Sequence, residues 1–320
     1  MKKKIACLLL FLSTFPSIFS STVSYTIWHK DDTKITCFGD VHTYTDPDKD
    51  FLVLHYLNEI SRPSTLFLEY SPLRRETLRT ISPRNFNKSL LKMAFDASFQ
   101  RGMLTFKLSD RRNIFGYELM NFLQNARDLE KYEPATHADV FNQTLSFGYQ
   151  QPISTFINDI ETVKKEINSL RDHEKISEKE KATLSHIEKE INDGQTILNK
   201  TIEKYEINKD APLFESLIHL TENHPRVTLQ FINKILYPFL QTIIESGFFI
   251  DILNETLAGT QHIILYAGNN HIIAVNKYLQ RTDFIKKSLQ GISTYHKIIP
   301  PDVIEKNQIN DAEMAADLFS

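Results

Sequence analysis

Two histidines of this chain stand at the ends of β-prone apolar runs, each three residues after a glycine. The run at 25–42, YTIWHKDDTKITCFGDVH, ends in His42, and the run at 262–271, HIILYAGNNH, ends in His271. Imidazole nitrogens ligate divalent metals and transfer protons near neutral pH, so a pair of them can build a catalytic or metal centre. We predict that the two runs are neighbouring strands of one sheet and that their histidines converge on a single site.

The Gly-x-x-His pattern occurs a third time, from Gly259 to His262. This histidine stands at the start of the strand predicted at 263–266, whereas ligands of open parallel sheets bind at the carboxyl ends of the strands. The pattern alone is therefore weak evidence. Its position at a strand end is what marks His42 and His271 as the functional pair.

Charged side chains follow two other predicted strands at the same edge. Glu69 comes after the compact apolar strand 65–68, and Asp110 and Arg112 come after the strand predicted at 103–108. Two imidazoles and one carboxylate can hold a divalent metal ion and leave an open position that activates water. The predicted metal ligands are His42, Glu69, His271 and Asp110.

The sequence leaves two assignments of roles open. In the first, Glu69 ligates the metal beside the histidines. In the second, Glu69 is the general base, and the histidines ligate together with Asp40 or Asp110. In either case Arg111 or Arg112 would stabilise a developing oxyanion or an anionic group of the substrate. The glycines that precede the histidines would let the chain turn sharply and let a ligand approach the backbone.

A sheet must position these residues, and the sequence predicts one. Strands at 25–28 and 34–38 form a hairpin. A helix at 49–60 connects this hairpin to strand 65–68, which implies a right-handed parallel crossover. Further elements are the strands predicted at 103–108, 263–266 and 293–299 and the helix at 272–279. The predicted fold class is α/β, with a mostly parallel central sheet begun by a β-hairpin and helices on its faces.

Between the third and the later strands, the segment 117–255 is predicted to be a long helical insertion. Its apolar residues recur at helical spacing in 160–170 and 184–205, with a polar turn at 171–177. This pattern predicts an antiparallel helical hairpin of coiled-coil type. We interpret the hairpin as a solvated arm or cap with a narrow apolar seam. The alternative is an arm that binds a protein partner through residues 156–206.

The most apolar part of the insertion is 231–253, which Pro238 and Gly247 interrupt. It also carries polar residues, among them Gln241 and Glu245. Charged and amide side chains within such a run favour buried or lid-like helices over a membrane span.

The N-terminal residues 1–20 have the features of a secretory signal peptide, with three lysines, an apolar run and an exit rich in small residues. We therefore expect a protein that is periplasmic or secreted and has no stable membrane span after the signal is removed. The expected mature chain is a single domain at 21–300 followed by a polar tail at 301–320.

Composition narrows the partners further. The chain has 37 basic and 40 acidic residues, a formal net charge of −3, and no dominant basic patch, which argues against nucleic acid as a partner. Cys7 would leave with the signal, so Cys37 would have no disulfide partner. We predict that Cys37 is a small buried hydrophobe.

Taken together, these features resemble the TraB/GumN family, which includes the Tiki-type proteases and belongs to a wider group with erythromycin-esterase-like and ChaN-like proteins. That family opens with a hairpin that carries a Trp and runs into Gly-x-x-His, as TIWHKDDTKITCFGDVH does here. It continues with a strand ending in Glu, as LFLEY does, and a largely helical middle. It closes with a strand, a second Gly-x-x-His and a helix, as ILYAGNNHIIAVNKYL does.

The resemblance implies a metal-dependent hydrolase that cleaves a peptide or ester bond. It identifies His42, Glu69 and His271 as motif residues, adds an arginine such as Arg112, and implies a divalent ion such as Mn, Co or Zn. Two alternatives are a non-catalytic protein that holds a metal or haem through the same histidines, as the ChaN-like resemblance allows, and an interaction protein that acts through residues 156–206.

Overall fold

The computed structural model describes most of the sheet and the helical insertion. The described residues are 21–41, 56–57, 60–69, 103–109, 152–224, 227 and 230–290. Several predicted features lie outside them, namely the signal peptide at 1–20, His42, most of the helix at 49–60, Asp110, Arg111, Arg112, the strand at 293–299 and the tail at 301–320.

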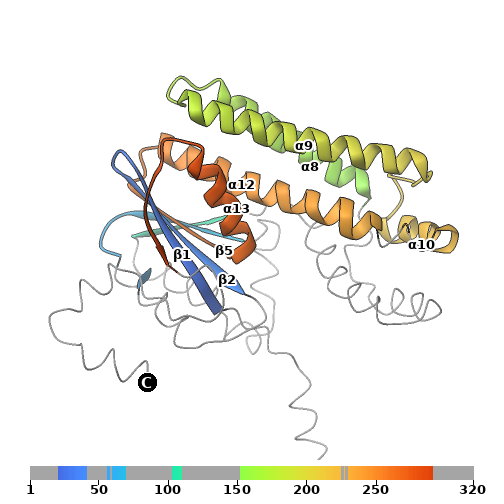
Figure 1. The fold of residues 1–320 in the computed structure, drawn as a ribbon, viewed down its shortest axis with the longest axis horizontal. Helices are drawn as coiled ribbons and strands as arrows, with labels where there is room; N and C mark the ends of the chain where they lie inside the picture. The colour runs from blue at the N-terminus through green and yellow to red at the C-terminus, as the bar shows by residue number, and fades with distance from the viewer. Residues whose placement is uncertain are drawn as a thin grey trace, which may run out of the picture.

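In the described part of the chain, six strands form one sheet, over which the helices lie (Figure 1). Its strand order is β4-β3-β5-β2-β1-β6, in which β2, β5, β3 and β4 are parallel neighbours and β1 pairs antiparallel with both β2 and β6. The strands are β1 (Ser21–Lys30), β2 (Thr33–Val41), β3 (Ser64–Leu68), β4 (Leu104–Leu108), β5 (His262–Gly268) and β6 (Ile285–Gln290). The predicted α/β class with a mostly parallel sheet begun by a hairpin is confirmed.

The hairpin of β1 and β2 is longer than predicted, because the strands extend beyond the apolar cores of both runs. Its turn places Asp31 at a φ of 51°, a left-handed conformation that Asp tolerates better than most residues. β6 was not predicted. Its sequence, IKKSLQ, is mostly polar and shows little of the alternation that marks a strand.

The two histidine-bearing runs are neighbouring parallel strands, as predicted. β2 and β5 are paired from Lys34 with His262 through to Asp40 with Gly268. β3 lies on the other side of β5, where Leu68 pairs with Tyr266. The carboxyl ends of these three strands therefore lie at one edge of the sheet.

Alternation along the strands buries apolar side chains on both faces of the sheet, as expected of parallel strands covered on two sides. Ile35, Cys37 and Leu265 belong to a hydrophobic cluster that also contains buried residues of α8, α9, α12 and α13. Phe38 and Ile264 belong to a second hydrophobic cluster. Cys37 is fully buried and has no disulfide, which confirms its predicted role. Burial raises the pKa of its thiol to about 12, although a hydrogen bond with Thr26 opposes the shift.

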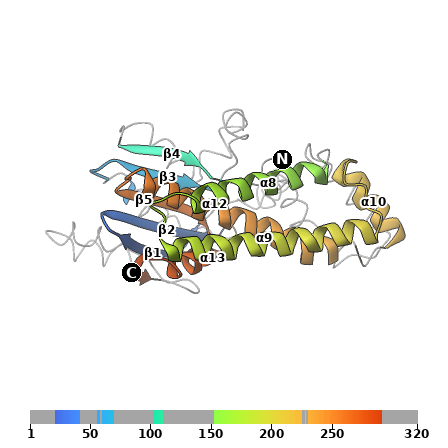
Figure 2. The same cartoon turned by 90° about the horizontal axis from the view of Figure 1, so that it is seen from above.

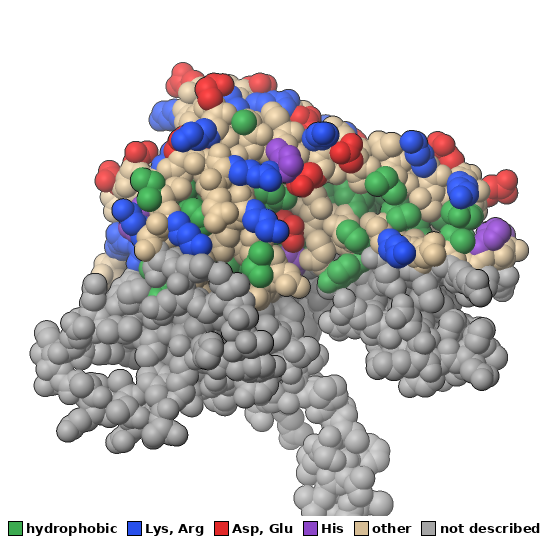
Figure 3. Space-filling view, viewed as in Figure 1, with side chains coloured by type: hydrophobic (Ala, Val, Ile, Leu, Met, Phe, Trp, Pro, Cys, Tyr) green, Lys and Arg blue, Asp and Glu red, His purple; other side chains and the backbone are tan. Residues whose placement is uncertain are grey.

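The helical insertion contains the predicted hairpin. α8 (Ile153–Arg171) and α9 (Glu178–Lys204) are joined by a short turn at 172–177. Ser177 and Glu180 form a capping box that starts α9 after the turn. On the outer surface of the helical insertion, basic and acidic side chains are interspersed (Figure 3).

The apolar segment after the hairpin forms one continuous helix. It consists of a π-helix, η3 (Phe231–Leu236), which runs directly into α12 (Tyr237–Leu257). A separate helix, α10 (Leu213–Asn223), precedes it in the chain. The predicted interruptions do not break the continuous helix. Pro238 is the second residue of α12, directly after the π-helical residues of η3, and Gly247 is buried within α12. The stretch 234–257 is long and apolar enough to cross a membrane, a test that buried core helices also pass, and 61% of its apolar window is buried inside the fold.

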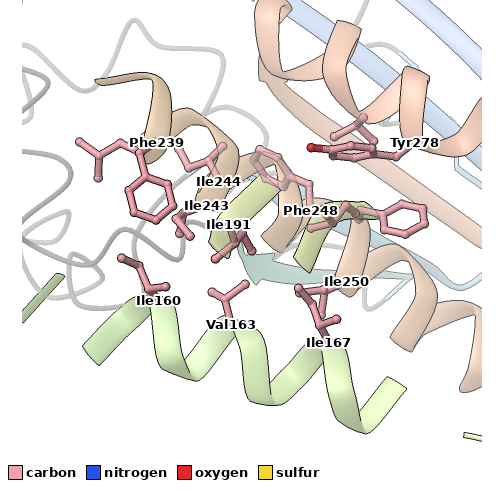
Figure 4. Close-up of a cluster of buried hydrophobic side chains, with 14 of the residues drawn as sticks. Ile160, Val163, Ile167, Ile191, Phe239, Ile243, Ile244, Phe248, Ile250 and Tyr278 are labelled. Atoms are coloured by element: carbon pink, nitrogen blue, oxygen red, sulfur yellow. The ribbon is translucent and has the colours of Figure 1, made fainter. Parts of the chain in front are cut away.

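α12 fills the apolar seam of the helical hairpin, so α8, α9 and α12 form a three-helix bundle (Figure 2). Ile160, Val163 and Ile167 of α8 point toward α12 (Figure 4). A Cβ atom at Gly194 of α9 would lie 2.7 Å from the ring of Phe239, so glycine permits the close approach of the two helices. The hairpin is therefore part of the core rather than a separate arm.

The layers follow from these contacts. α12 and α13 (Asn269–Gln280) lie over the sheet, and α8 and α9 lie over α12 (Figure 1). This arrangement brings a helix of the insertion, α12, beside the helix that carries His271.

Candidate active site

The candidate site begins where β5 runs directly into α13. Gly268 is the last residue of β5 and also the N-cap of α13, which places His271 in the first turn of that helix. Beside it, β3 ends at Leu68 and is followed by Glu69, whose backbone N–H donates to Tyr266 O at 3.3 Å. Two predicted site residues from distant parts of the sequence are thus held at adjacent strand ends.

Glu69 and His271 are in contact. Glu69 Oε1 lies 3.4 Å from His271 Nε2, and Glu69 Oε2 accepts a 2.7 Å hydrogen bond from the backbone N–H of Gly268. The two side chains are only 14% and 7% exposed, respectively. Because the Gly268 amide fixes one carboxylate oxygen, the other is held facing the imidazole.

A second carboxylate reaches the same imidazole from the helical insertion. Glu245 Oε1 of α12 lies 3.3 Å from His271 Nδ1, and its side chain is 15% exposed. The ring of Phe248, one turn further along α12, has its centroid 6.3 Å from that of His271. The role of Glu245 was not predicted from the sequence. The available signal was a carboxylate within a strongly apolar helix, which needs a polar partner when buried.

Both ring nitrogens of His271 therefore face carboxylate oxygens. A neutral imidazole carries one N–H and can donate to only one of them. The other contact requires a second ring proton, a proton on the carboxyl group, or a cation between the two atoms. Both distances, 3.4 Å at Nε2 and 3.3 Å at Nδ1, are longer than a charge-assisted hydrogen bond of about 2.8 Å.

Two asparagines of α13 position this helix on β1. The hydroxyl of Ser24 donates to Asn269 Oδ1. Seven residues further along, Asn276 Oδ1 accepts from Thr26 Oγ1 and from Trp28 Nε1, both at 2.8 Å. Because the two asparagines are two helical turns apart, they fix both the rotation and the height of α13, and with it the position of His271.

The described residues bring together two of the predicted site residues, Glu69 and His271. The other three, His42, Asp110 and Arg112, lie outside the described residues. The strands that precede them end at the same edge, because Asp40 of β2 is paired with Gly268 and Leu108 of β4 is paired with Leu68. The strand ends that precede the predicted site residues therefore lie at one edge of the sheet.

The glycines differ from their predicted roles. Gly39 lies inside β2 rather than in a sharp turn, and its missing side chain makes room for Asn269 of α13. Gly268 adopts a φ of −52° and a ψ of 139°, a conformation open to other residues, at the change from strand to helix.

The third Gly-x-x-His histidine is a structural residue at the opposite edge, as its position predicted. His262 is 3% exposed at the start of β5. Ser64 Oγ donates to Arg62 O and also lies 2.8 Å from His262 Nδ1, so Nδ1 carries the proton of this pair. Nε2 of His262 lies 3.1 Å from the hydroxyl of Tyr56.

α12 places two further acids against the sheet. Asp251 accepts a hydrogen bond from the buried hydroxyl of Ser109, which follows β4. Glu255 accepts from Thr65 of β3 and forms an ion pair with Lys107 of β4. These contacts hold α12 on the sheet, and Glu245 is the acid on the same helix that meets the histidine.

The separation of Glu69 Oε1 and His271 Nε2 can be compared with that of two metal ligands. Two ligands at about 2.1 Å from one tetrahedral zinc ion lie about 3.4 Å from each other, which matches the separation of Glu69 Oε1 and His271 Nε2. Within the described residues, no group of three His, Cys, Asp or Glu side chains is arranged to hold a metal ion. Further ligands would have to come from the predicted positions outside that part of the chain, His42 and Asp110.

Comparisons of the chain with protein-family models, with curated proteins and with solved structures find no match.

Proposed function

We propose that this protein is an exported, metal-dependent hydrolase whose centre lies at the carboxyl edge of the sheet, around Glu69 and His271. The observation that carries the proposal is the imidazole of His271 between two carboxylates, with Nε2 at 3.4 Å from Glu69 and Nδ1 at 3.3 Å from Glu245. Histidines that ligate a metal commonly donate their other ring N–H to a carboxylate, and this arrangement has the same form.

The chain's own residues would perform three tasks. Nε2 of His271 and Oε1 of Glu69 would bind the ion, together with His42 and Asp110. The backbone N–H of Gly268 keeps the Glu69 carboxylate turned toward the site. Phe248 packs beside the imidazole and would keep water from that side of the ring. A bound divalent ion would supply an activated water and polarise the bond that is cleaved.

The substrate class in this proposal is a peptide or ester bond. It comes from the resemblance to the TraB/GumN family, as does a role for Arg112 in stabilising negative charge. The signal-like residues 1–20 support action after export, in a periplasm or outside the cell.

The test is turnover and metal content of the exported, processed protein. We expect the protein loaded with Mn²⁺, Co²⁺ or Zn²⁺ to cleave members of a peptide and ester library. Substitutions His271→Ala, Glu69→Gln and His42→Ala should lower turnover at least about 100-fold and reduce bound metal. The matched control is His173→Ala, because His173 is exposed in the turn between α8 and α9 and should affect neither.

The outcomes separate the alternatives. Turnover that is unchanged in His271→Ala contradicts the site. A different outcome is a protein that binds a metal, or shows a haem absorption band, and has no turnover. If His271→Ala then lost that binding, the result would favour the alternative of a non-catalytic binding protein. The interaction-protein alternative has less support, because the apolar seam of the helical hairpin is filled by α12.

A further inference from the structure

We infer that Glu245 is a positioning residue, by which the three-helix bundle sets the orientation and the proton-bearing nitrogen of the His271 ring. The inference rests on the proposed function for the role of Nε2 as the working nitrogen. The placement of the ring proton can be tested without any activity.

The first support is the division of contacts along α13. Asn269 and Asn276, seven residues apart, contact β1. His271 and Tyr278, also seven residues apart, contact acids of the bundle, Glu245 of α12 and Glu190 of α9. Residues seven apart lie on one side of a helix, so α13 has one polar row for the sheet and another for the bundle.

The second support is the geometry at the ring. Glu69 comes from the sheet and Glu245 from the bundle, and each faces a different nitrogen of His271. When Nδ1 of the neutral ring donates to Glu245, Nε2 directs its lone pair toward Glu69 and the strand ends, and its contact with Glu69 then requires a proton on that carboxyl group or a cation. Without Glu245, Nδ1 loses the carboxylate that accepts its proton, whereas the carboxylate of Glu69 still faces Nε2, so we expect the ring proton to move to Nε2.

The third support is the rigidity of α12 around Glu245. Ile243, Ile244 and Phe248 are fully buried in the core cluster of the bundle. Glu245 therefore projects from a helix that cannot rotate without disturbing that core, and it holds the imidazole more firmly than a carboxylate from a loop would. The helical insertion would thus be a structural part of the site rather than a separate module.

Tyr278 provides a matched control, because it is the other contact of the same row. Its hydroxyl donates to Glu190 Oε2 at 3.2 Å. Burial, with Glu190 adding to it, raises the pKa of Tyr278, so the hydroxyl keeps its proton and this contact. Tyr278→Phe loosens the packing of α13 on the bundle and leaves both carboxylates at His271 in place.

The experiment is multiple-bond ¹H–¹⁵N NMR of ¹⁵N-histidine-labelled protein without metal at pH 8, with His271→Ala to assign the ring signals. In the wild type and in Tyr278→Phe we expect a proton on Nδ1. In Glu245→Leu we expect the proton to move to Nε2. Glu245→Ala is a second removal variant that adds no bulk, and circular dichroism checks that each variant folds.

Metal affinity and turnover provide a second readout. Glu245→Leu should lower each of them about 10- to 100-fold, as substitution of a supporting carboxylate does, whereas Tyr278→Phe should change each less than about 3-fold. A wild type without a proton on Nδ1, or removal variants that keep one, would overturn the inference and leave the proposed function standing. A wild type that neither binds metal nor turns over substrate would overturn the proposed function, while the ring protons would still decide the role of Glu245.

Discussion

Gly39 of β2 packs directly against Asn269 of α13, so closely that a Cβ atom at Gly39 would lie 2.6 Å from Asn269 Oδ1. The same Cβ would lie 2.6 Å from Ser24 Oγ and 3.0 Å from the Cα atom of Asn269. Three elements, β1, β2 and α13, therefore meet at this glycine. Since Asn269 is two residues before His271, the glycine determines how close the histidine lies to the end of β2.

We predict that Gly39→Ala destabilises the protein by about 1–3 kcal/mol, the usual effect of adding a methyl group to a packed core. The added methyl should displace the first turn of α13, so any activity that depends on His271 should fall further than the stability alone explains. Urea unfolding measures the first effect and turnover the second. The double substitution Ser24→Ala and Asn269→Ala in the Gly39→Ala background removes both side-chain oxygens and should recover part of the stability. Wild-type stability in Gly39→Ala would contradict the packing.

The contact of Gly194 with Phe239 tests whether the helical hairpin is part of the core. Gly194→Ala gains about 1 kcal/mol in helix propensity, but the methyl would stand 2.7 Å from a ring that is itself packed against Phe156. Overpacking typically costs about 1–3 kcal/mol, so we predict a net loss of stability of about 1 kcal/mol. Asn192→Ala, at an exposed position two residues earlier in α9, is the control and should be neutral or stabilising.

Phe239→Leu provides the matching test, because it makes room at the same contact. Combined with Gly194→Ala, it should cost less than the sum of the two single substitutions. Additive losses in this double-mutant cycle, measured by thermal or urea unfolding, would mean that the two helices do not pack as described.

Glu255 should make the stability of the fold depend on pH. Burial opposes its ionisation, but hydrogen bonds from Lys107, Thr260 and Thr65 outweigh burial and hold the pKa of Glu255 below its ordinary value of 4.5. A carboxyl group with a depressed pKa in the folded protein stabilises it above the ordinary pKa, and this contribution is lost as the pH falls through the folded pKa.

We therefore predict that Glu255→Gln is less stable than the wild type at pH 7 and that the difference shrinks below about pH 4.5. Urea unfolding at pH 7, 5, 4 and 3 measures the difference. Glu203→Gln, at an exposed position of α9, is the control and should stay close to the wild type throughout. A Glu255→Gln difference that is equal at all four pH values would show that the carboxylate charge does not contribute to stability.

The sequence by itself determined the frame of the site. The runs that end in His42 and His271 are apolar and β-prone, and the strand before Glu69 is short and fully apolar, which is typical of buried parallel strands. Parallel strands align their carboxyl ends, so Glu69 and His271 could be predicted to meet although about 200 residues separate them. The helical hairpin was equally predictable from its apolar periodicity.

Only the tertiary structure decided which elements pack against the helical hairpin and which residue contacts Glu245. Periodicity shows which side of α8 and α9 is apolar, but it does not show that α12 packs there, because many apolar surfaces would satisfy the same pattern. In the same way, an acid in an apolar helix requires a partner, but nothing local identifies it. The packing of α12 between the α8–α9 hairpin and the sheet brings Glu245 to His271, and the close approach of α13 to β2 gives Gly39 its role. Both depend on the positions of whole elements rather than on neighbouring residues.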